Sequence, residues 1–386
     1  MRSVTAPCGS DGWSAEGPAT GRGWTPGDLP ATMQRVAGAG TPLLLILFGV
    51  GAAATWVAGT YLSRTTDALD DRLRLGEAVG GMVFLAVAGS LPEVAITISA
   101  ALAGNLGLAS GNLIGGIATQ TLVLVLCDAV ISGERPLTFM VGSLIPVLEA
   151  FLVVIVVTAT VAGGLLPTSN SIGPVSPASI AIVVLWVGGL IVLNRVRKDP
   201  RWRAAAPESN PGRPNRRVRH PTAPRPYGER STARVVAVFL TASAVTLVAG
   251  VVLANSGSAL ADRAGINGVV FGATILAAVT ALPELSSGIA ATRLGDYQLA
   301  MGDIFGGNAF QVCLFLLADL VAGKPVLPSQ GNANSWIGEL GLILTAVYGV
   351  GIIARPKGRW ARLGPDSIAV LALYAVGIAG LFAVRQ

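Results

Sequence analysis

Long apolar segments separated by short polar breaks run along the chain from residue 42 onward. A helix that crosses a lipid bilayer needs roughly 20 mostly apolar residues, and about ten segments of this chain meet that requirement. The predicted spans are 42–63, 77–103, 109–127, 137–162, 177–195, 233–258, 267–293, 299–321, 335–354 and 365–384. The pattern therefore predicts an all-α membrane protein with about ten transmembrane helices.

A polar segment divides these spans into five and five. It is rich in proline and arginine and lacks helical periodicity, which is typical of a linker. The first forty residues are rich in Gly, Pro, Ser and Thr and lack the apolar core of a secretory signal. The predicted organisation is a disordered tail (1–40), a first five-helix repeat (41–195), a basic cytoplasmic linker (196–232) and a second five-helix repeat (233–386).

One motif occurs in both halves of the chain. A shift of 191 positions, which takes Glu93 to Glu284, aligns Leu-Pro-Glu in the two copies without a gap. The register continues over 81–128 and 272–319, where several glycines, a glutamine and an aspartate coincide. Similarity over this length indicates an internal duplication, which decides the architecture before any other interpretation.

Charge placement predicts the orientation of the spans. Only 12% of the 386 residues are charged, about half the usual fraction in soluble proteins. The arginines lie mainly in loops beside apolar segments, which the positive-inside rule explains better than nucleic-acid binding does. A cytoplasmic linker with five spans on each side puts both termini outside and turns the second half upside down. Such inverted repeats, with broken helices at the midplane, are typical of secondary transporters.

Glu93 and Glu284 each fall near the middle of a predicted span, where a carboxylate costs roughly 2.5–3.5 kcal/mol. A proline precedes each glutamate, and because proline lacks an amide hydrogen we expect the helix to break there. We expect the carbonyls just before such a break to be free for cation binding. The candidate oxygen donors are the carbonyls of Ala86 and Ala277 and the hydroxyls of Ser90 and Thr280. An equally simple role for the two hydroxyls is a hydrogen bond to a backbone carbonyl.

Asn112 and Asp303 occupy equivalent positions in the helix that follows each glutamate. Neighbouring glycines allow close helix packing, which we expect to bring both side chains to the glutamates. The combined ligand charge reaches −3, from Glu93, Glu284 and Asp303. Hard cations such as Ca²⁺ prefer six to eight oxygen ligands, and acids this close share protons when no cation is bound. Protons and metal ions then compete for one site, which is the physical basis of antiport.

These two copies, each with Leu-Pro-Glu followed by Gly-Asn or Gly-Asp and a glycine pair, resemble the α-repeats of the sodium/calcium exchanger family in the cation/Ca²⁺ exchanger superfamily. The resemblance covers about 77–128 and 267–320. It implies a secondary active antiporter that exchanges Ca²⁺, or a similar cation, for Na⁺ by alternating access. The ion-binding residues that it implies are Glu93, Glu284, Asn112 and Asp303, the carbonyls of Ala86 and Ala277, and the hydroxyls of Ser90 and Thr280.

The motif departs from the family pattern in ways that concern the counter-ion. One hydroxyl is lost from each copy, at Gly89 and at Ala281. Sodium-using members often have a serine where this chain has Leu108 and Leu299. Because fewer oxygens remain for Na⁺, exchange of Ca²⁺ or another cation against H⁺ is the alternative.

Three further acids lie in or beside the predicted spans. Glu149 lies deep in the fourth span, where it is either a proton site or a partner for a hydroxyl such as that of Ser143. Asp128 and Asp319 fall at span ends, and we expect each to be a solvated helix cap.

Other functional classes fit the residues less well. A channel needs a continuous polar stripe, whereas the polar residues cluster at one depth. The single histidine, His220, lies in the linker, and the three cysteines lack paired spacing, which argues against a zinc or histidine-based enzyme centre. We therefore predict a multi-pass plasma-membrane transporter that is not an enzyme and uses no cofactor. Its predicted partners are small inorganic cations and the lipid bilayer, without nucleic acid.

Overall fold

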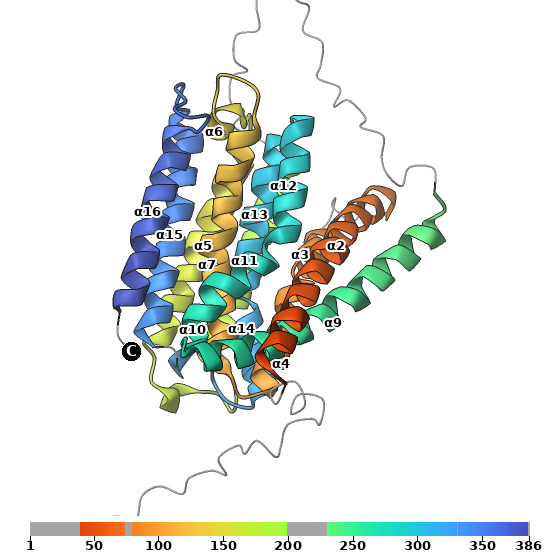
Figure 1. The fold of residues 1–386 in the computed structure, drawn as a ribbon. Coiled ribbons are helices and arrows are strands. Elements are labelled where there is room, and N and C mark those ends of the chain that lie inside the picture. The colour runs from red at the N-terminus through yellow and green to blue at the C-terminus, as the bar shows by residue number, and fades with distance from the viewer. Residues whose placement is uncertain (1–38, 74–78, 199–229, 330, 385–386) are drawn as a thin grey trace, which may run out of the picture.

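The computed structural model describes residues 39–73, 79–198, 230–329 and 331–384 (Figure 1). Nearly all of the predicted tail and linker lies outside these described residues. Within the described ranges the secondary structure is helical, without a β-strand. Figure 1 shows an upright bundle beside a tilted pair of long helices.

The helices of the first half are α2 (Thr41–Leu73), α3 (Val79–Gly89), α4 (Leu91–Leu102), α5 (Leu106–Val130), α6 (Leu137–Met140), α7 (Ile145–Gly164) and α8 (Pro177–Lys198). Those of the second half are α9 (Thr232–Ala264), α10 (Gly268–Phe271), the π-helical η4 (Gly272–Leu276), α11 (Ala277–Thr280), α12 (Leu282–Leu294), α13 (Tyr297–Gln311), α14 (Leu314–Ala322), α15 (Asn332–Ala354) and α16 (Pro365–Ala383). Seven helices among the described residues are long and apolar enough to cross a membrane, or eight if one bent pair forms a single span. The prediction of an all-helical chain with several membrane spans is confirmed.

Several predicted spans are interrupted in the structure. The span predicted at 137–162 consists of the short α6 and a separate helix, α7, which begins only at Ile145. Pro146 lies in the first turn of α7, where its missing N–H is tolerated, whereas inside a longer helix it would remove a hydrogen bond. The other interruptions include those at the two Leu-Pro-Glu motifs, as expected.

The tilted pair consists of α2 and α9, which pack against each other in opposite directions (Figure 1). At one end of the pair, the Arg72 guanidinium donates to the Thr232 hydroxyl at 3.0 Å. At the other end, the Arg263 guanidinium donates to the Thr41 hydroxyl at 2.9 Å. The 191-residue shift takes Thr41 to Thr232 and Arg72 to Arg263, so the same contact occurs twice. The duplication therefore extends into the first helix of each half.

Two equivalent glycines let this pair pack against the broken helices. A Cβ atom on Gly59 of α2 would lie 2.5 Å from Cγ of Pro283. A Cβ atom on Gly250 of α9 would lie 2.6 Å from Cβ of Ala95 and 3.1 Å from the carbonyl oxygen of Pro92. Each long helix therefore contacts the proline-containing helix of the other half, at a distance that only glycine permits.

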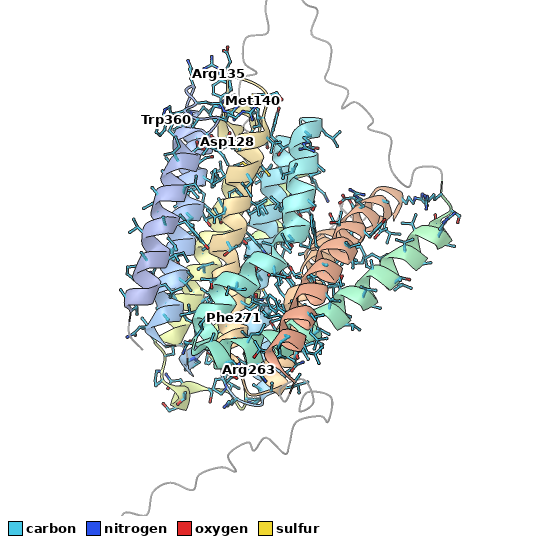
Figure 2. All side chains as sticks on the ribbon, viewed as in Figure 1. Asp128, Arg135, Met140, Arg263, Phe271 and Trp360 are labelled. Carbon is cyan, nitrogen blue, oxygen red and sulfur yellow. The ribbon has the colours of Figure 1, made fainter. Side chains whose placement is uncertain are left out.

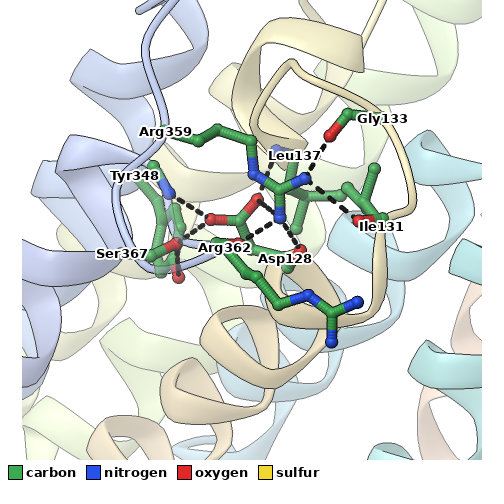
Figure 3. Close-up of polar contacts among 9 residues, drawn as sticks. Asp128, Ile131, Gly133, Leu137, Tyr348, Arg359, Arg362 and Ser367 are labelled. Atoms are coloured by element: carbon green, nitrogen blue, oxygen red, sulfur yellow. Dashed lines mark hydrogen bonds and ion pairs between the residues drawn. The ribbon is translucent and has the colours of Figure 1, made fainter.

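Asp128 at the end of α5 is fully buried. Its carboxylate accepts hydrogen bonds from the backbone N–H of Leu137 (2.8 Å) and Gly364 (2.6 Å) and from the hydroxyl of Ser367 (2.8 Å) (Figure 3). The guanidinium of Arg359 lies 3.8 Å away and also donates to nearby backbone carbonyls. The carboxylate thus joins α5 to the beginnings of α6 and α16.

Asp319, the counterpart of Asp128, is held in the same way at the end of α14. It is fully buried and accepts from the backbone N–H of Val326 (2.7 Å) and Ser176 (2.9 Å) and from the Ser179 hydroxyl (2.7 Å). The expectation of solvated caps was wrong, because the connecting loops fold over the helix ends and supply N–H donors in place of water. Each aspartate joins its own half to the last helix of the other half.

The two ends of the molecule differ in their loops. In Figure 1, α2 begins and α16 ends at the lower end, whereas α9 begins at the upper end. Figure 2 shows Arg135 and Trp360 at the upper end with Asp128, and Arg263 at the lower end. The arginines of the 131–140 and 355–362 loops therefore lie at the end where α9 begins.

We expect Gly59→Ala and Gly250→Ala each to destabilise the protein by about 1–3 kcal/mol, because the added methyl group overpacks the contact with a broken helix. The measurement is thermal unfolding of the detergent-solubilised protein.

Gly49→Ala is the matched control, since a Cβ atom on Gly49 of the same helix would meet no atom within 4 Å. We expect that change to be neutral or to stabilise by up to about 1 kcal/mol, through helix propensity alone. Equal effects of the three substitutions would contradict the proposed packing role.

Candidate cation site

The two Leu-Pro-Glu motifs form helix breaks. Ser90 separates α3 from α4, and Ala281 separates α11 from α12, where the bend is 44°. The prolines lie in the first turn of the new helix in each case. Glu93 and Glu284 therefore also lie in a first turn, where the partial positive charge of the helix N-terminus stabilises a carboxylate. The predicted broken helices are confirmed.

The two predicted carbonyl ligands are not freed by these breaks. The carbonyl of Ala86 accepts the backbone N–H of Ser90 at 3.2 Å, and that of Ala277 accepts the backbone N–H of Ala281 at 3.0 Å. The expectation was wrong because proline removes the donor for the carbonyl four residues earlier, which is Ala88 in the first copy. A second lone pair remains for an ion on the carbonyl of Ala86, whereas that of Ala277 also accepts the Thr280 hydroxyl at 3.2 Å.

Glu93 is almost completely buried, with 1% of its surface exposed. Its Oε1 atom accepts a long hydrogen bond of 3.4 Å from Gln120, and its Oε2 atom has no partner among the described residues. Glu284 is half-buried, and its Oε2 atom is also without a described partner. Glu284 lies within electrostatic range of both Glu93 and Asp303. Acids from both halves therefore lie within electrostatic range of one another, and their oxygens are incompletely satisfied.

Asp303 faces a cavity and accepts a 2.6 Å hydrogen bond from the Ser287 hydroxyl. Ser287 lies three residues after Glu284, on the same face of α12. Sequence reasoning missed this serine because its counterpart in the first copy is Ile96, so comparison of the repeats gave no polar pair. Its spacing from Glu284 was the available signal.

Asn112 and Thr280 are fully buried. Neither amide atom of Asn112 has a hydrogen-bond partner among the described residues. The Thr280 hydroxyl donates to the carbonyl of Ala277 at 3.2 Å and also lies beside the Glu93 carboxylate. The alternative of a backbone hydrogen bond for Thr280 is therefore confirmed. The sequence expectation that Asn112 is brought to the site remains a prediction.

Glycines of the second repeated helix permit close packing, as the pattern predicted. A Cβ atom on Gly111 would lie 2.4 Å from the carbonyl oxygen of Val269, and one on Gly115 would lie 2.2 Å from Cα of Ala273. Helix α5 of the first half thus lies directly against the π-helical segment of the second half. This contact holds Asn112 in the centre of the bundle.

A cavity of about 560 Å³ connects several of the predicted site residues. Its lining includes Ala86, Ser90, Gln120, Glu284 and Asp303, and also Asp67, Glu149, Arg197, Asp296 and Leu299. No group of three or more His, Cys, Asp or Glu side chains in the described ranges lies close enough to hold a metal ion. The acids are therefore spread along the cavity and are not assembled as a compact metal centre.

A second cavity, of about 690 Å³, lies between α4 and α9. The 191-residue shift takes its lining residues Asn105 and Leu108 to Asp296 and Leu299, which line the first cavity. The two cavities are thus counterparts. Only the first reaches Glu284 and Asp303; the lining of the second contains none of the repeat acids.

Glu149 also lines the first cavity, although it lies outside the repeated motif. Its Oε1 atom is 2.6 Å from an Nη atom of Arg197 at the end of α8. The hydroxyl of Ser143, the partner suggested by the sequence, instead accepts the backbone N–H of Ile145. Proximity of an arginine at the end of another helix could not be read from the repeat pattern.

Apolar helices around a cavity lined by acids from both halves are characteristic of membrane transporters. A family model described as sodium/calcium exchanger protein matches residues 43–194 and 234–383, one range in each half. The chain therefore belongs to the sodium/calcium exchanger protein family.

Relatives align with most of the chain. The putative antiporter CaxA of Alkalimonas amylolytica is 25% identical over 306 residues, which cover 79% of this chain and 88% of that protein. The inner membrane protein YrbG of Escherichia coli (strain K12) is 28% identical over 256 residues, with coverage of 66% and 70%.

Solved structures share the fold at lower identity. The H⁺/Ca²⁺ exchanger CAX has a TM-score of 0.62 at 15% identity, covering 89% of this chain and 82% of that one. The sodium-calcium exchanger NCX_Mj has a TM-score of 0.56 at 17% identity, covering 89% and 99%. These similarities establish the fold.

We expect Asn112→Leu to raise the stability of the cation-free protein by about 1 kcal/mol, because it replaces a buried amide without partners by an apolar group of similar shape. If Asn112 binds the cation, the substitution also removes most of the stabilisation that added Ca²⁺ provides. The measurement is thermal unfolding in detergent with and without Ca²⁺.

Asn334→Leu is the control for this experiment. The Nδ2 atom of Asn334 donates to the Ser110 hydroxyl at 2.9 Å, so the same change there breaks a hydrogen bond. We expect it to lower stability and to leave the Ca²⁺ effect intact. A cation-free Asn112→Leu protein less stable than the wild type would contradict the prediction.

Proposed function

We propose that the protein is a secondary active antiporter that exchanges Ca²⁺, or a similar hard cation, for Na⁺ by alternating access. The observation that carries this proposal is a single cavity lined by Glu284 and Asp303 of the second half and by Ala86 and Ser90 of the first. Its carboxylate, hydroxyl and carbonyl oxygens are the ligand types that hard cations prefer. Membership of the exchanger family and the descriptions of the relatives support the same reading.

In this proposal the ion is held by Glu93, Glu284, Asp303 and Asn112, with the hydroxyls of Ser90 and Thr280 and the carbonyl of Ala86 as further ligands. The incompletely satisfied oxygens of Glu93 and Glu284 support this role, since a buried carboxylate without partners is costly until a cation compensates it. The ions are cargo, and no resident cofactor is required.

The proposal includes two inverted halves of five membrane-spanning segments each. The antiparallel α2–α9 pair, with the same arginine–threonine contact at both ends, supports the inversion. The equivalent roles of Asp128 and Asp319 support a shared layout of the later helices. Inverted halves offer two equivalent ways of opening a central site, which alternating access requires.

One-sided access to the acids fits this mechanism. The cavity that reaches Glu284 also contains Arg197 at the end of α8, close to where the linker begins. Arg135 lies at the end of the molecule where α9 begins (Figure 2), and Arg359 donates to the carbonyl of Gly133 in the same loop. We therefore assign that end and the linker to the cytoplasmic side of the plasma membrane. The conformation described is then open to the cytoplasm.

Exchange against H⁺ is the second candidate, and one observation favours it. The Leu299 side chain is 51% exposed and lines the cavity one turn before Asp303. An apolar group there supplies no oxygen for a bound Na⁺, whereas a proton needs only a carboxylate.

We expect reconstituted protein to take up ⁴⁵Ca²⁺ when proteoliposomes carry an outward Na⁺ gradient, and Glu284→Gln to reduce the uptake to below about a tenth, because it removes a charge from the site. An outward H⁺ gradient is tested in parallel. Uptake driven by H⁺ alone identifies the second candidate.

Glu339→Gln serves as the matched control, since Glu339 is an exposed glutamate of α15 that does not line the cavity. We expect it to transport like the wild type. Failure of both gradients to drive Ca²⁺ into vesicles containing folded wild-type protein would refute the proposed function.

A further inference from the structure

Glu149 and Arg197 form an ion pair in the wall of the cavity that reaches Glu284 and Asp303. Glu149 belongs to α7 and is 4% exposed. Arg197 lies in the last turn of α8, and its side chain is 41% exposed. An Nη atom of Arg197 lies 2.6 Å from Oε1 of Glu149. A buried acid and a partly exposed arginine therefore line one cavity together with Glu284 and Asp303.

The second oxygen of Glu149 is unused. Its Oε2 atom is buried and has no hydrogen-bond partner among the described residues. It faces Gly302 of α13, because a Cβ atom on that glycine would lie 3.1 Å from it. Gly302 immediately precedes Asp303. The free oxygen is thus directed at the turn of α13 that carries a proposed cation ligand, and a carboxylate can accept contacts on both oxygens.

We propose that Glu149 is an additional cation-binding residue of this cavity. In this proposal the Arg197 guanidinium pairs with the Glu149 carboxylate when no transported ion is bound there. The inference rests on the proposed function, because it names a further residue of the same cation route. The cations in question are hard ones of the Ca²⁺ class, bound by oxygen.

The chemistry of the pair fits this exchange. An arginine keeps its charge at all relevant pH values, so it competes with a metal ion for a carboxylate without any change of protonation. Its long side chain can move into the water of the cavity, because it is already partly exposed. A buried carboxylate cannot stay without a positive partner at reasonable cost. Departure of the guanidinium therefore requires that another cation take its place.

Only one of the two cavities has a glutamate at the position of Glu149. The 191-residue shift takes Glu149 to Leu340, an apolar residue. The described lining of the opposite cavity contains neither residue of the pair nor an equivalent glutamate. The additional cation position is thus restricted to the cavity that reaches Glu284.

The test is equilibrium binding of ⁴⁵Ca²⁺ to the purified full-length protein in detergent. We expect Arg197→Gln to tighten Ca²⁺ binding by about tenfold, because it removes a competing charge from the cavity. Arg197→Lys keeps the charge, and we expect its gain in Ca²⁺ affinity to be much smaller than that of Arg197→Gln. In the double variant Arg197→Gln, Glu149→Gln we expect the gain to be lost, because the carboxylate that the arginine had occupied is absent.

Arg195→Gln is the matched control. Arg195 is an exposed arginine of the same last turn and does not line the cavity, so its removal should leave Ca²⁺ binding unchanged. Size-exclusion chromatography of each variant reports whether it is folded, and Glu149→Gln preserves the shape of the buried side chain.

Two results would overturn the inference while leaving the proposed function intact. One is unchanged Ca²⁺ affinity in Arg197→Gln, and the other is a gain that persists in the double variant. Either result counts when the wild type binds Ca²⁺ and the Glu284→Gln variant does not. Absence of Ca²⁺ binding to both the wild type and Arg197→Gln would refute the proposed function together with the inference.

Discussion

The cost of holding carboxylates inside an apolar bundle is the constraint on which this structure depends. For Asp128 and Asp319 this cost is offset, since each carboxylate accepts hydrogen bonds from two backbone N–H groups and a hydroxyl. For Glu93 and Glu284 it is not fully offset, because each carboxylate has an oxygen without a described partner. The two pairs of acids thus differ in how many of their carboxylate oxygens have polar partners. The fully hydrogen-bonded pair stabilises the fold, whereas a bound cation can supply the contacts that the other pair lacks.

The duplication is most symmetric where it determines packing. The arginine–threonine contacts at the two ends of the α2–α9 pair are equivalent, and Gly59 and Gly250 admit equivalent prolines. The polar residues of the proposed cation site do not follow this symmetry. Asn112 corresponds to Asp303 and Ile96 to Ser287. Packing that repeats constrains both halves alike, whereas a single central site needs each ligand only once, so its residues can differ between the copies.

The sequence was sufficient for the helix breaks, because a proline inside an apolar segment has one local consequence whatever surrounds it. It was also sufficient for the helical nature of the chain. It was not sufficient for Ser287 or for the partner of Glu149, since both depend on how helices far apart in the sequence are placed. Asp128 looked solvated because its position at a span end carries no information about the loop that covers it. The carbonyls of Ala86 and Ala277 were misjudged through a local error, since the proline affects the carbonyl four residues before it.

The two cavities fit the proposed mechanism, in which a site opens to one side of the membrane at a time. Their linings correspond under the 191-residue shift at Asn105 and Asp296, yet only one extends to Glu284. Since the helices that line them come from duplicated segments, each half has the residues to form either wall. What differs is local packing, for example the π-helical segment Gly272–Leu276 of the second half, which lies against α5. Single π-helical turns inside α-helices frequently occur at functional sites. Equivalent segments with different local conformations are what the proposed alternating access requires, because exchanging them would open the opposite cavity.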